Sequence, residues 1–250
     1  MTSHDTDWFT NDDFWEASFA HMFPDSRFDA AGDELDAILA LAATTPQRVL
    51  DMACGPGRHA IAAAERGLEV VGVDRSAFLL QHARDRAADA GVEVEWVQGD
   101  MRDHVQEPPV DLVLNVFTSF GYFEDDAENA RVLENAFASL RSGGTLVLDV
   151  AGKEVLARIF LPSSADVLAD GLVVQRRRVV DDWSRIENEW TFLQGEAVRS
   201  FRFRHWVYSG RELAQMLTRA GFADVRLFGD FDGARYGPEA TRLVAVARKP

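Results

Sequence analysis

The sequence predicts an α/β protein with a mostly parallel sheet, and three observations support this. Between residues 45 and 150, short apolar runs typical of buried strands alternate with segments of helical period. Three of the runs lead into an aspartate, and a Gly-x-Gly turn follows the first one. The chain has 250 residues, 47% of them hydrophobic, which is enough for one sizeable domain with an added element.

Helices rich in aromatic residues are expected over residues 11–23 and 30–43, before the first strand. The first of them spaces large apolar side chains along one helical face: Trp15, Phe19, Met22 and Phe23. We therefore predict an N-terminal helical cap, residues 1–44, ahead of a main domain, residues 45–250.

The first apolar run leads into a loop shaped to hold a small charged ligand. Residues 49–60 read VLDMACGPGRHA: a short strand ending at Asp51, a tight turn through Gly55 and Gly57, and the start of a helix. Glycine lets the backbone turn sharply and lets a ligand approach, and the first turn of a helix has unpaired N–H groups. Ala53 stands where a glycine is common, which costs little if this residue keeps a negative φ.

The spacing of Gly55, Gly57 and Ala60 also fits a dinucleotide-binding turn, and Asp74 ends the second strand where a ribose-binding acid is expected. Such an acid suits any nucleoside. Asp51 argues against a dinucleotide, because a carboxylate at the mouth of the loop repels a pyrophosphate and attracts an ammonium group. A nucleoside with a cationic amino-acid tail fits better, and S-adenosylmethionine is such a molecule.

The next two strands add polar residues at the same edge of the sheet. The strand at residues 92–98 is followed by Asp100, placed to accept a hydrogen bond from an adenine amino group, and by Met101, placed to cover the ring. The fourth strand, residues 111–117, carries Asn115 and leads into a further loop. Ligands of open α/β sheets bind beyond the carboxyl ends of the strands, so this loop is expected to face the substrate.

With acids at positions 51, 74 and 100, residues 45–150 resemble the class I S-adenosylmethionine-dependent methyltransferases. The resemblance implies a doubly wound seven-stranded sheet, mostly parallel, with an antiparallel C-terminal strand. It also implies that the loop after Asp51 holds the methionine part of the cofactor, Asp74 both ribose hydroxyls and the Asp100 region the adenine. The sequence is similar to small-molecule enzymes such as amino-sugar and glycine N-methyltransferases, which share an aromatic N-terminal helix and a β-rich insertion.

Similar methyltransferases place an arginine at the position of Arg27, where a guanidinium can pair with the methionine carboxylate. A solvated arginine explains this residue equally well. Most aromatic residues of the cap are expected in the core, but Trp8, Phe9 or Trp15 could pack on the sulfonium cation. The expected cofactor-binding residues are Trp15, Arg27, Asp51, Ala53, Gly55, Gly57, Asp74, Arg75, Asp100, Met101 and Asn115.

An antiparallel β insertion is expected at about residues 160–208, as a lid over the site or as a surface that pairs with a second subunit. Three of its segments alternate in period two: residues 172–180, 185–193 and 198–208. A helix and two last strands follow, near residues 210–220, 224–228 and 243–247.

Methyl transfer from a sulfonium depends mainly on alignment and desolvation, because the leaving group is already activated. An amine acceptor can react in its neutral form, whereas a phenol or an alcohol needs a base. We predict Tyr122 and His205 as catalytic residues, with His59 as a further candidate base. His205 lies on an apolar face of an inserted strand, where a histidine held by a structural hydrogen bond is the alternative.

The composition restricts the partners. A formal net charge of −15 disfavours nucleic acid, and no apolar run approaches the roughly 20 residues of a membrane span. Cys54 is the only cysteine, which excludes an internal disulfide and a cysteine-rich metal site, so no metal is predicted. The N-terminus lacks the pattern of a secretory signal, and we expect a cytoplasmic enzyme with a small-molecule acceptor.

Two other functions fit part of the pattern. An NAD-dependent oxidoreductase would share the first loop and Asp74, but it would not explain Asp51 or the Asp100–Met101 pair. A non-catalytic S-adenosylmethionine-binding protein would explain every residue up to Met101. An open crevice on the acceptor side would favour an enzyme over such a sensor.

Overall fold

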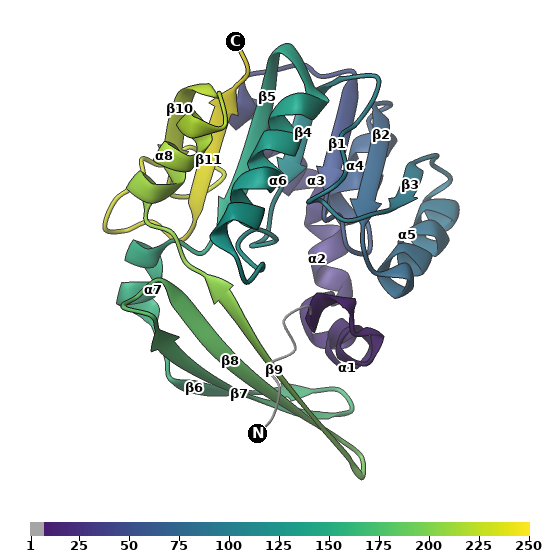
Figure 1. Cartoon of the computed structure of the whole chain (residues 1–250). Coiled ribbons are helices and arrows are strands. Elements are labelled where there is room, and N and C mark those ends of the chain that lie inside the picture. The colour runs from purple at the N-terminus through teal and green to yellow at the C-terminus, as the bar shows by residue number, and fades with distance from the viewer. Residues whose placement is uncertain (1–7) are drawn as a thin grey trace.

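The computed structural model describes residues 8–250, and its strands form two separate sheets (Figure 1). The larger sheet contains β1 Arg48–Met52, β2 Glu69–Asp74, β3 Glu95–Gln98, β4 Val110–Asn115, β5 Leu140–Val150, β10 Ala223–Phe228 and β11 Leu243–Arg248. Its order is β10-β11-β5-β4-β1-β2-β3. The neighbours from β5 to β3 are parallel, and β11 is antiparallel to both β5 and β10. The predicted doubly wound, mostly parallel seven-stranded sheet is thus confirmed.

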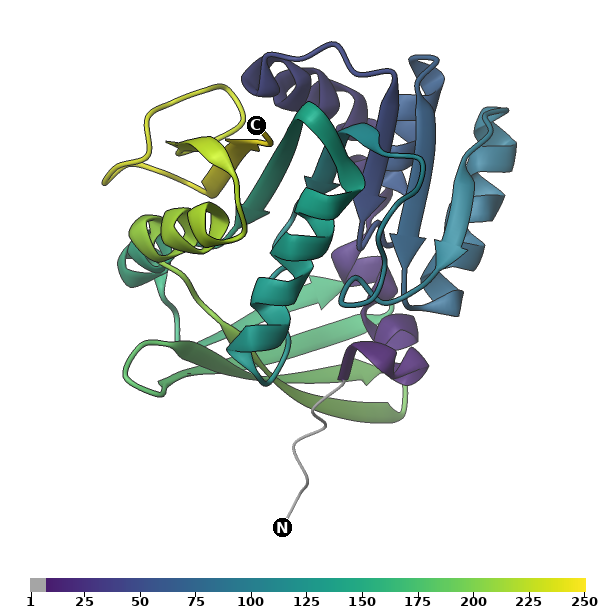
Figure 2. The same cartoon turned by 45° about the horizontal axis from the view of Figure 1, so that its top comes forward.

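Helices cover both faces of this sheet, with α3, α4 and α5 on one side and α6 and α8 on the other (Figure 2). The helices are η1 Trp8–Thr10, α1 Asp12–Met22, α2 Asp25–Asp29, α3 Ala31–Ala42, α4 Arg58–Glu65, α5 Ala77–Ala90, α6 Asp126–Ser139, α7 Lys153–Ile159 and α8 Gly210–Arg219. The expected helices at 11–23, 30–43 and 210–220 appear as α1, α3 and α8, while α2 and α7 were not predicted.

Helix ends coincide with capping residues. At the start of α5 the Ser76 hydroxyl accepts a hydrogen bond from the Leu79 N–H at 3.2 Å, and Gly91 ends the helix with a φ of 68°. At the start of α8, Ser209 and Glu212 form a reciprocal capping box. These local contacts satisfy backbone groups that a helix end leaves unpaired, and they fix where each helix begins.

Two buried apolar clusters attach the helices to the sheet. On one face Leu35 and Ile38 of α3 pack with Val49 of β1, and all three are fully buried. On the other face Leu133 of α6 and Leu213 of α8 belong to the second cluster. Helix α3, which we expected in an N-terminal cap, therefore packs as one layer on the main sheet.

The smaller sheet is the predicted insertion, and it lies beyond the carboxyl ends of the parallel strands (Figure 1). It contains β6 Ser163–Leu168, β7 Gly171–Val180, β8 Arg185–Gln194 and β9 Ala197–Trp206, in that order and antiparallel. The expected strands correspond to β7, β8 and β9. Strand β6 was missed because it is a short, mostly exposed edge strand without an apolar alternation.

Aromatic side chains join the N-terminal segment to this lid. The Trp8 ring stacks on Phe203 of β9 with centroids 4.6 Å apart, and Phe14 of α1, 1% exposed, contacts Phe201 edge-on at 5.4 Å. Trp190 of β8 completes the cluster, 5.5 Å from Phe203. The lid, η1 and α1 are therefore held together by ring packing.

Candidate functional site

A cavity of about 180 Å³ opens where the strand ends, α1, α2 and the loop after β4 meet. Its position agrees with the rule that ligands bind beyond the carboxyl ends of the strands. Ten of the thirteen predicted site residues line it: Trp15, Arg27, Asp51, Ala53, Gly55, Asp74, Arg75, Asp100, Met101 and Tyr122. Gly57, Asn115 and His205 are not among the lining residues.

The loop after β1 has the sharp conformation that its glycines suggested, with φ values of 56° at Gly55 and 80° at Gly57. The condition under which alanine would cost little at position 53 is not met, because the φ of Ala53 is 59°. A left-handed alanine costs about 1–2 kcal/mol, so this loop carries strain that glycine would avoid. Gly57 serves packing: a Cβ there would lie 2.5 Å from the Trp96 ring of β3.

Asp51 is a buried carboxylate at the wall of the cavity, 3% exposed. Burial raises the pKa of Asp51 to about 7; the Arg58 charge opposes the shift and the Asp74 charge adds to it. The negative charge of Asp51 is therefore incompletely compensated in the protein alone. A cationic ammonium fits this position, as the sequence predicted for the methionine part of the cofactor.

Asp74, the last residue of β2, holds the backbone of the loop after β1. One carboxylate oxygen accepts the Gly55 N–H at 2.7 Å, and the other accepts the Ser76 N–H at 2.9 Å. Burial raises the pKa of Asp74 despite backbone hydrogen bonds from Ser76, Gly55 and Arg75. The carboxylate also lines the cavity, where it could accept a hydrogen bond from a hydroxyl group of a ligand.

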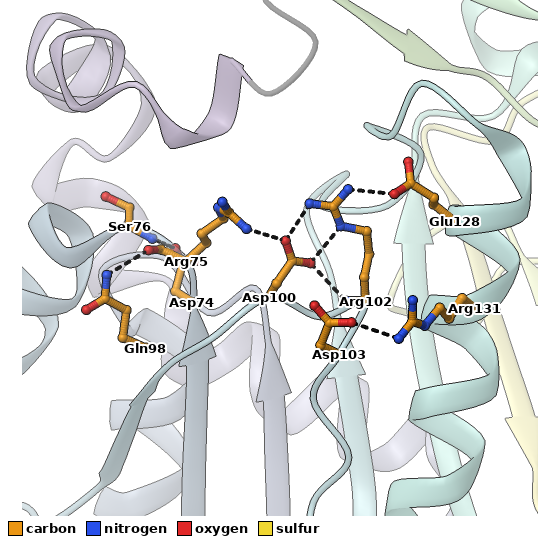
Figure 3. Close-up of polar contacts among 9 residues, drawn as sticks. All are labelled: Asp74, Arg75, Ser76, Gln98, Asp100, Arg102, Asp103, Glu128 and Arg131. Atoms are coloured by element: carbon orange, nitrogen blue, oxygen red, sulfur yellow. Dashed lines mark hydrogen bonds and ion pairs between the residues drawn. The ribbon is translucent and has the colours of Figure 1, made fainter.

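Asp100 is surrounded by arginines, a feature that the sequence did not suggest. Figure 3 shows Arg75 and Arg102 pointing at its carboxylate from opposite sides, at 2.6 Å and 2.7 Å. Arg102 also donates its Nε and its backbone N–H to the other oxygen, at 3.0 Å and 2.9 Å. Burial opposes ionisation of Asp100, but the Arg102 and Arg75 hydrogen bonds outweigh it and lower its pKa. Because all four acceptor directions are used, an adenine amino group would have to displace one arginine.

Arg75 is the arginine that can move, since its side chain is 43% exposed whereas that of Arg102 is 16% exposed. Arg102 is further held by Glu128 of α6 at 2.7 Å (Figure 3). The predicted adenine contact to Asp100 therefore requires Arg75 to turn away from the carboxylate.

The side of the cavity that was predicted to face the acceptor is aromatic. Burial raises the pKa of Tyr122 to about 12, and its ring lies 5.1 Å from that of Trp8. His205 lies behind Tyr122, with ring centroids 5.4 Å apart, and its Nδ1 is 3.2 Å from the Asn188 amide nitrogen. Burial lowers the pKa of His205 to about 4, so this histidine is neutral at physiological pH. The geometry matches the structural alternative for His205.

Asn115 and the N-terminal residues take supporting positions. The Asn115 amide donates to the Met52 carbonyl at 3.1 Å and lies 3.7 Å from the Met101 sulfur, behind the cavity wall. Trp15 donates its Nε1–H to the Phe9 carbonyl at 2.8 Å, which fixes the ring at the wall. The side chain of Arg27 is exposed at the rim.

Arg58 and Phe117 line the cavity but were not predicted. Arg58 donates to Glu34 at 2.7 Å, and its guanidinium carbon lies 3.5 Å from the centroid of the Phe117 ring. Burial lowers the pKa of His59, which lies 3.1 Å from the same Glu34 oxygen. The signal in the sequence was a basic pair directly after Gly57, at the start of an otherwise small and apolar helix.

Within residues 8–250, no group of three or more histidine, cysteine or carboxylate side chains could hold a metal ion. None of the helices there is both long and apolar enough for a membrane crossing.

Comparisons with known proteins find methyltransferases. Residues 49–144 match a family model described as a methyltransferase domain. The putative methyltransferase YqeM of Bacillus subtilis (strain 168) is 26% identical over 237 residues, which cover 92% of this chain and 96% of that protein. The glycine/sarcosine N-methyltransferase of Aphanothece halophytica is 25% identical, with 81% and 76% covered.

Solved structures show the same fold. An S-adenosylmethionine-dependent methyltransferase from Clostridium acetobutylicum has a TM-score of 0.78 at 14% identity, covering 95% of this chain and 98% of that one. CcbJ from Streptomyces caelestis has a TM-score of 0.74 at 22% identity, covering 88% and 95%. Residues 49–144 are thus a methyltransferase domain, and the similar proteins support the predicted S-adenosylmethionine-dependent methyltransferase activity.

Proposed function

We propose that the enzyme transfers the methyl group of S-adenosylmethionine to the amine nitrogen of a small cytoplasmic metabolite. The observation that carries this proposal is the protonation state of the two predicted catalytic residues, Tyr122 and His205. The pKa of Tyr122 is raised to about 12 and that of His205 is lowered to about 4, both by burial. Near neutral pH the Tyr122 phenol stays protonated, and the neutral His205 imidazole is a weak base that lies behind Tyr122 and does not line the cavity. Neither group is therefore suited to deprotonate a phenol or an alcohol, which would need a base. An amine that enters in its neutral form needs none.

The cofactor roles follow from the cavity wall. Asp51 would hold the ammonium group, Asp74 the ribose hydroxyls, and Met101 the adenine ring. Arg27 at the rim would pair with the methionine carboxylate, and Trp15 would pack near the sulfonium. When bound, the cofactor supplies an activated methyl group, and these residues hold it in a fixed direction.

The acceptor would enter between the cofactor and the aromatic wall. Trp8, Phe9, Tyr122 and Phe123 line this part of the cavity and exclude water from it. Two nitrogen-methylating relatives support an amine acceptor: the glycine/sarcosine N-methyltransferase named above and a Streptomyces venezuelae amino-sugar N,N-dimethyltransferase, which is 30% identical over 123 residues. Ubiquinone biosynthesis O-methyltransferases also match, at 27% identity over 122 residues, so oxygen acceptors belong in the test.

A turnover screen with mass detection of the product tests the proposal. Amines, phenols and carboxylated metabolites are offered to the full chain with S-adenosylmethionine, and amines are expected to be methylated. The rate at low acceptor concentration should rise with pH until the amine is neutral. Methylation of phenols or alcohols alone would overturn the amine assignment.

Tyr122→Phe provides a second readout in the same assay. Since the phenol stays protonated across pH 6–9, the substitution should leave the shape of the pH profile unchanged. The rate loss should stay well under the roughly 10²-fold typical of a removed general base. Loss of an ionisation from the profile would show instead that Tyr122 is the base.

We also propose that the outer face of the lid pairs with a second copy of the chain. Four apolar residues lie opposite one another in register across its strands: Val167, Leu172, Leu193 and Val198. Val167 is 86% and Val198 66% exposed, and such an apolar row on a surface favours association. The double variant V167E/V198E should convert a dimer to a monomer in light scattering, whereas V105E, at a 40% exposed valine before β4, should not. A monomeric unmodified protein would refute the pairing.

A further inference from the structure

Two successive residues after β4 adopt a backbone conformation that neither favours. Phe117 and Thr118 both have a φ of 59°. Positive φ is uncommon outside glycine, and for a bulky or β-branched residue it is a true outlier. Both residues line the cavity. Strain of this kind persists only where the surroundings impose it, and it concentrates at functional sites.

Asp149 at the end of β5 imposes this conformation. Its carboxylate, which is fully buried, accepts the Phe117 N–H at 2.8 Å, and its backbone carbonyl accepts the Thr118 N–H at 3.0 Å. Arg242, the residue before β11, donates Nε to the same carboxylate at 2.8 Å and also donates Nη2. The planar fork of an arginine suits this bidentate pairing, and it neutralises a charge that burial would otherwise make costly.

The Phe117 ring is held from two sides as well. The guanidinium carbons of Arg58 and Arg242 lie 3.5 Å and 4.2 Å from its centroid. The His59 ring stacks on it at 5.2 Å with an interplanar angle of 25°. Because Arg58 and His59 begin α4, directly after the cofactor loop, Phe117 connects that loop to Asp149 and Arg242.

We propose that Asp149 and Arg242 are positioning residues for methyl transfer. They keep Phe117 and Thr118 in the left-handed conformation, and this sets the distance and angle between the acceptor wall and the methyl donor. The inference rests on the proposed function only in that the acceptor meets the donor at this wall. In-line transfer is sensitive to alignment, so release of the loop should slow the chemical step and leave cofactor affinity largely unchanged.

The test is a double-variant cycle between Arg242 and Thr118. Arg242→Lys keeps the charge but loses the fork, and it should lower the single-turnover rate at saturating substrates by on the order of 10–100-fold. Thr118→Gly removes the penalty for positive φ at one of the two strained residues, so the loop should depend less on the arginine. R242K should therefore cost less when it is made in the T118G background. A loss of rate that is equally large in both backgrounds would overturn the proposal.

Hydrogen exchange of the 116–123 segment gives a readout that needs no acceptor. R242K should speed exchange there, and R242K/T118G should restore part of the protection. R48K is the matched control, because Arg48 pairs with Glu69 at 3.1 Å at the opposite end of β1, and neither rate nor exchange should change. If the unmodified enzyme methylates no amine, the proposed function fails while exchange still decides the positioning role. Unchanged exchange in R242K would refute the positioning role of Arg242.

Discussion

Three aspartates that look equivalent in the sequence have three different environments. Asp51 is buried without full compensation, Asp74 is tied to backbone N–H groups, and Asp100 is held by two arginines. The pKa is raised at Asp51 and Asp74 and lowered at Asp100, because burial dominates at the first two and ion pairing at the third. The same residue type is thus suited to an ammonium group at Asp51 and to hydroxyl groups at Asp74, whereas at Asp100 it pairs with two arginines.

The raised pKa of Asp51 predicts a pH-dependent cofactor affinity. With a pKa of about 7 in the protein alone, the carboxyl is mostly protonated below pH 7, and an adjacent ammonium lowers that pKa. Binding should therefore release a proton below pH 7, and affinity should fall by up to about tenfold for each pH unit below 7. Calorimetry between pH 5.5 and 7.0, in buffers of different ionisation enthalpy, measures both quantities.

Asp51→Asn is the control for this experiment. The amide cannot ionise, so its weaker binding should show no proton release and a flat pH dependence over the same range. Equal affinity of the unmodified protein at pH 5.5 and 7.0 would argue against an ammonium site at Asp51.

At the level of the elements, the cofactor loop is shaped by β3 as much as by its own glycines. The Trp96 ring lies against Gly57 of the loop and Gly72 of β2, where an added Cβ would come within 2.5 Å of it at either position. Gly57 is therefore required both by packing and by its positive φ. It faces the Trp96 ring and does not line the cavity. The lid likewise depends on its neighbours, since the Trp206 indole donates to the Phe123 carbonyl at 2.9 Å.

Gly57→Ala and Gly67→Ala separate these two requirements. Both glycines have a positive φ, 80° and 76°, but nothing lies within 4 Å of a Cβ at Gly67. Both variants should lose about 1 kcal/mol or more from backbone strain, and only G57A should lose a further 1–3 kcal/mol, roughly, from overpacking. Chemical denaturation gives the two free energies of unfolding. Similar losses in both variants would contradict the packing role of Trp96.

At the level of the whole molecule, the N-terminal helix, the lid and the sheet meet around one cavity. Phe14 contacts rings from both the N-terminal segment and the lid, and its burial stabilises their docking, not the sheet core. Phe222, 3% exposed, packs against Phe137 in the core cluster on the other side of the molecule. The two residues offer a matched pair for separating docking from core stability.

Phe14→Ala and Phe222→Ala should each remove about 3–5 kcal/mol of packing, with different consequences. F14A should loosen α1 and the lid, and so reduce cofactor affinity and turnover more than the thermal midpoint. F222A should lower the thermal midpoint and leave turnover at 25 °C nearly unchanged. Calorimetry and turnover assays on both variants measure these effects. If turnover and thermal midpoint fell in the same proportion in both variants, the docking of α1 and the lid would not be separable from the stability of the core.

Much of the fold followed from local pattern. The order of strands and helices, the Gly55–Gly57 turn and the acids at the strand ends could be predicted, because periodicity and turn chemistry depend on residues close together in the chain. Strand β6 and helices α2 and α7 could not, since they are short or lack an apolar period. Ala53 was judged from residue type alone, and the surrounding loop imposed a φ that alanine does not favour.

The β/α order, the acids near the strand ends and with them the methyl donor could be inferred from local sequence, because parallel strands bring the residues at their carboxyl ends to the same edge of the sheet. Which side chains are partners follows from the tertiary structure alone. Arg75 and Arg102 occupy Asp100, Asn188 holds His205 behind Tyr122, and Arg242 lies 93 positions from the Asp149 that it neutralises. Such contacts depend on how distant segments pack, and that packing sets the burial and charge that fix each pKa and each role.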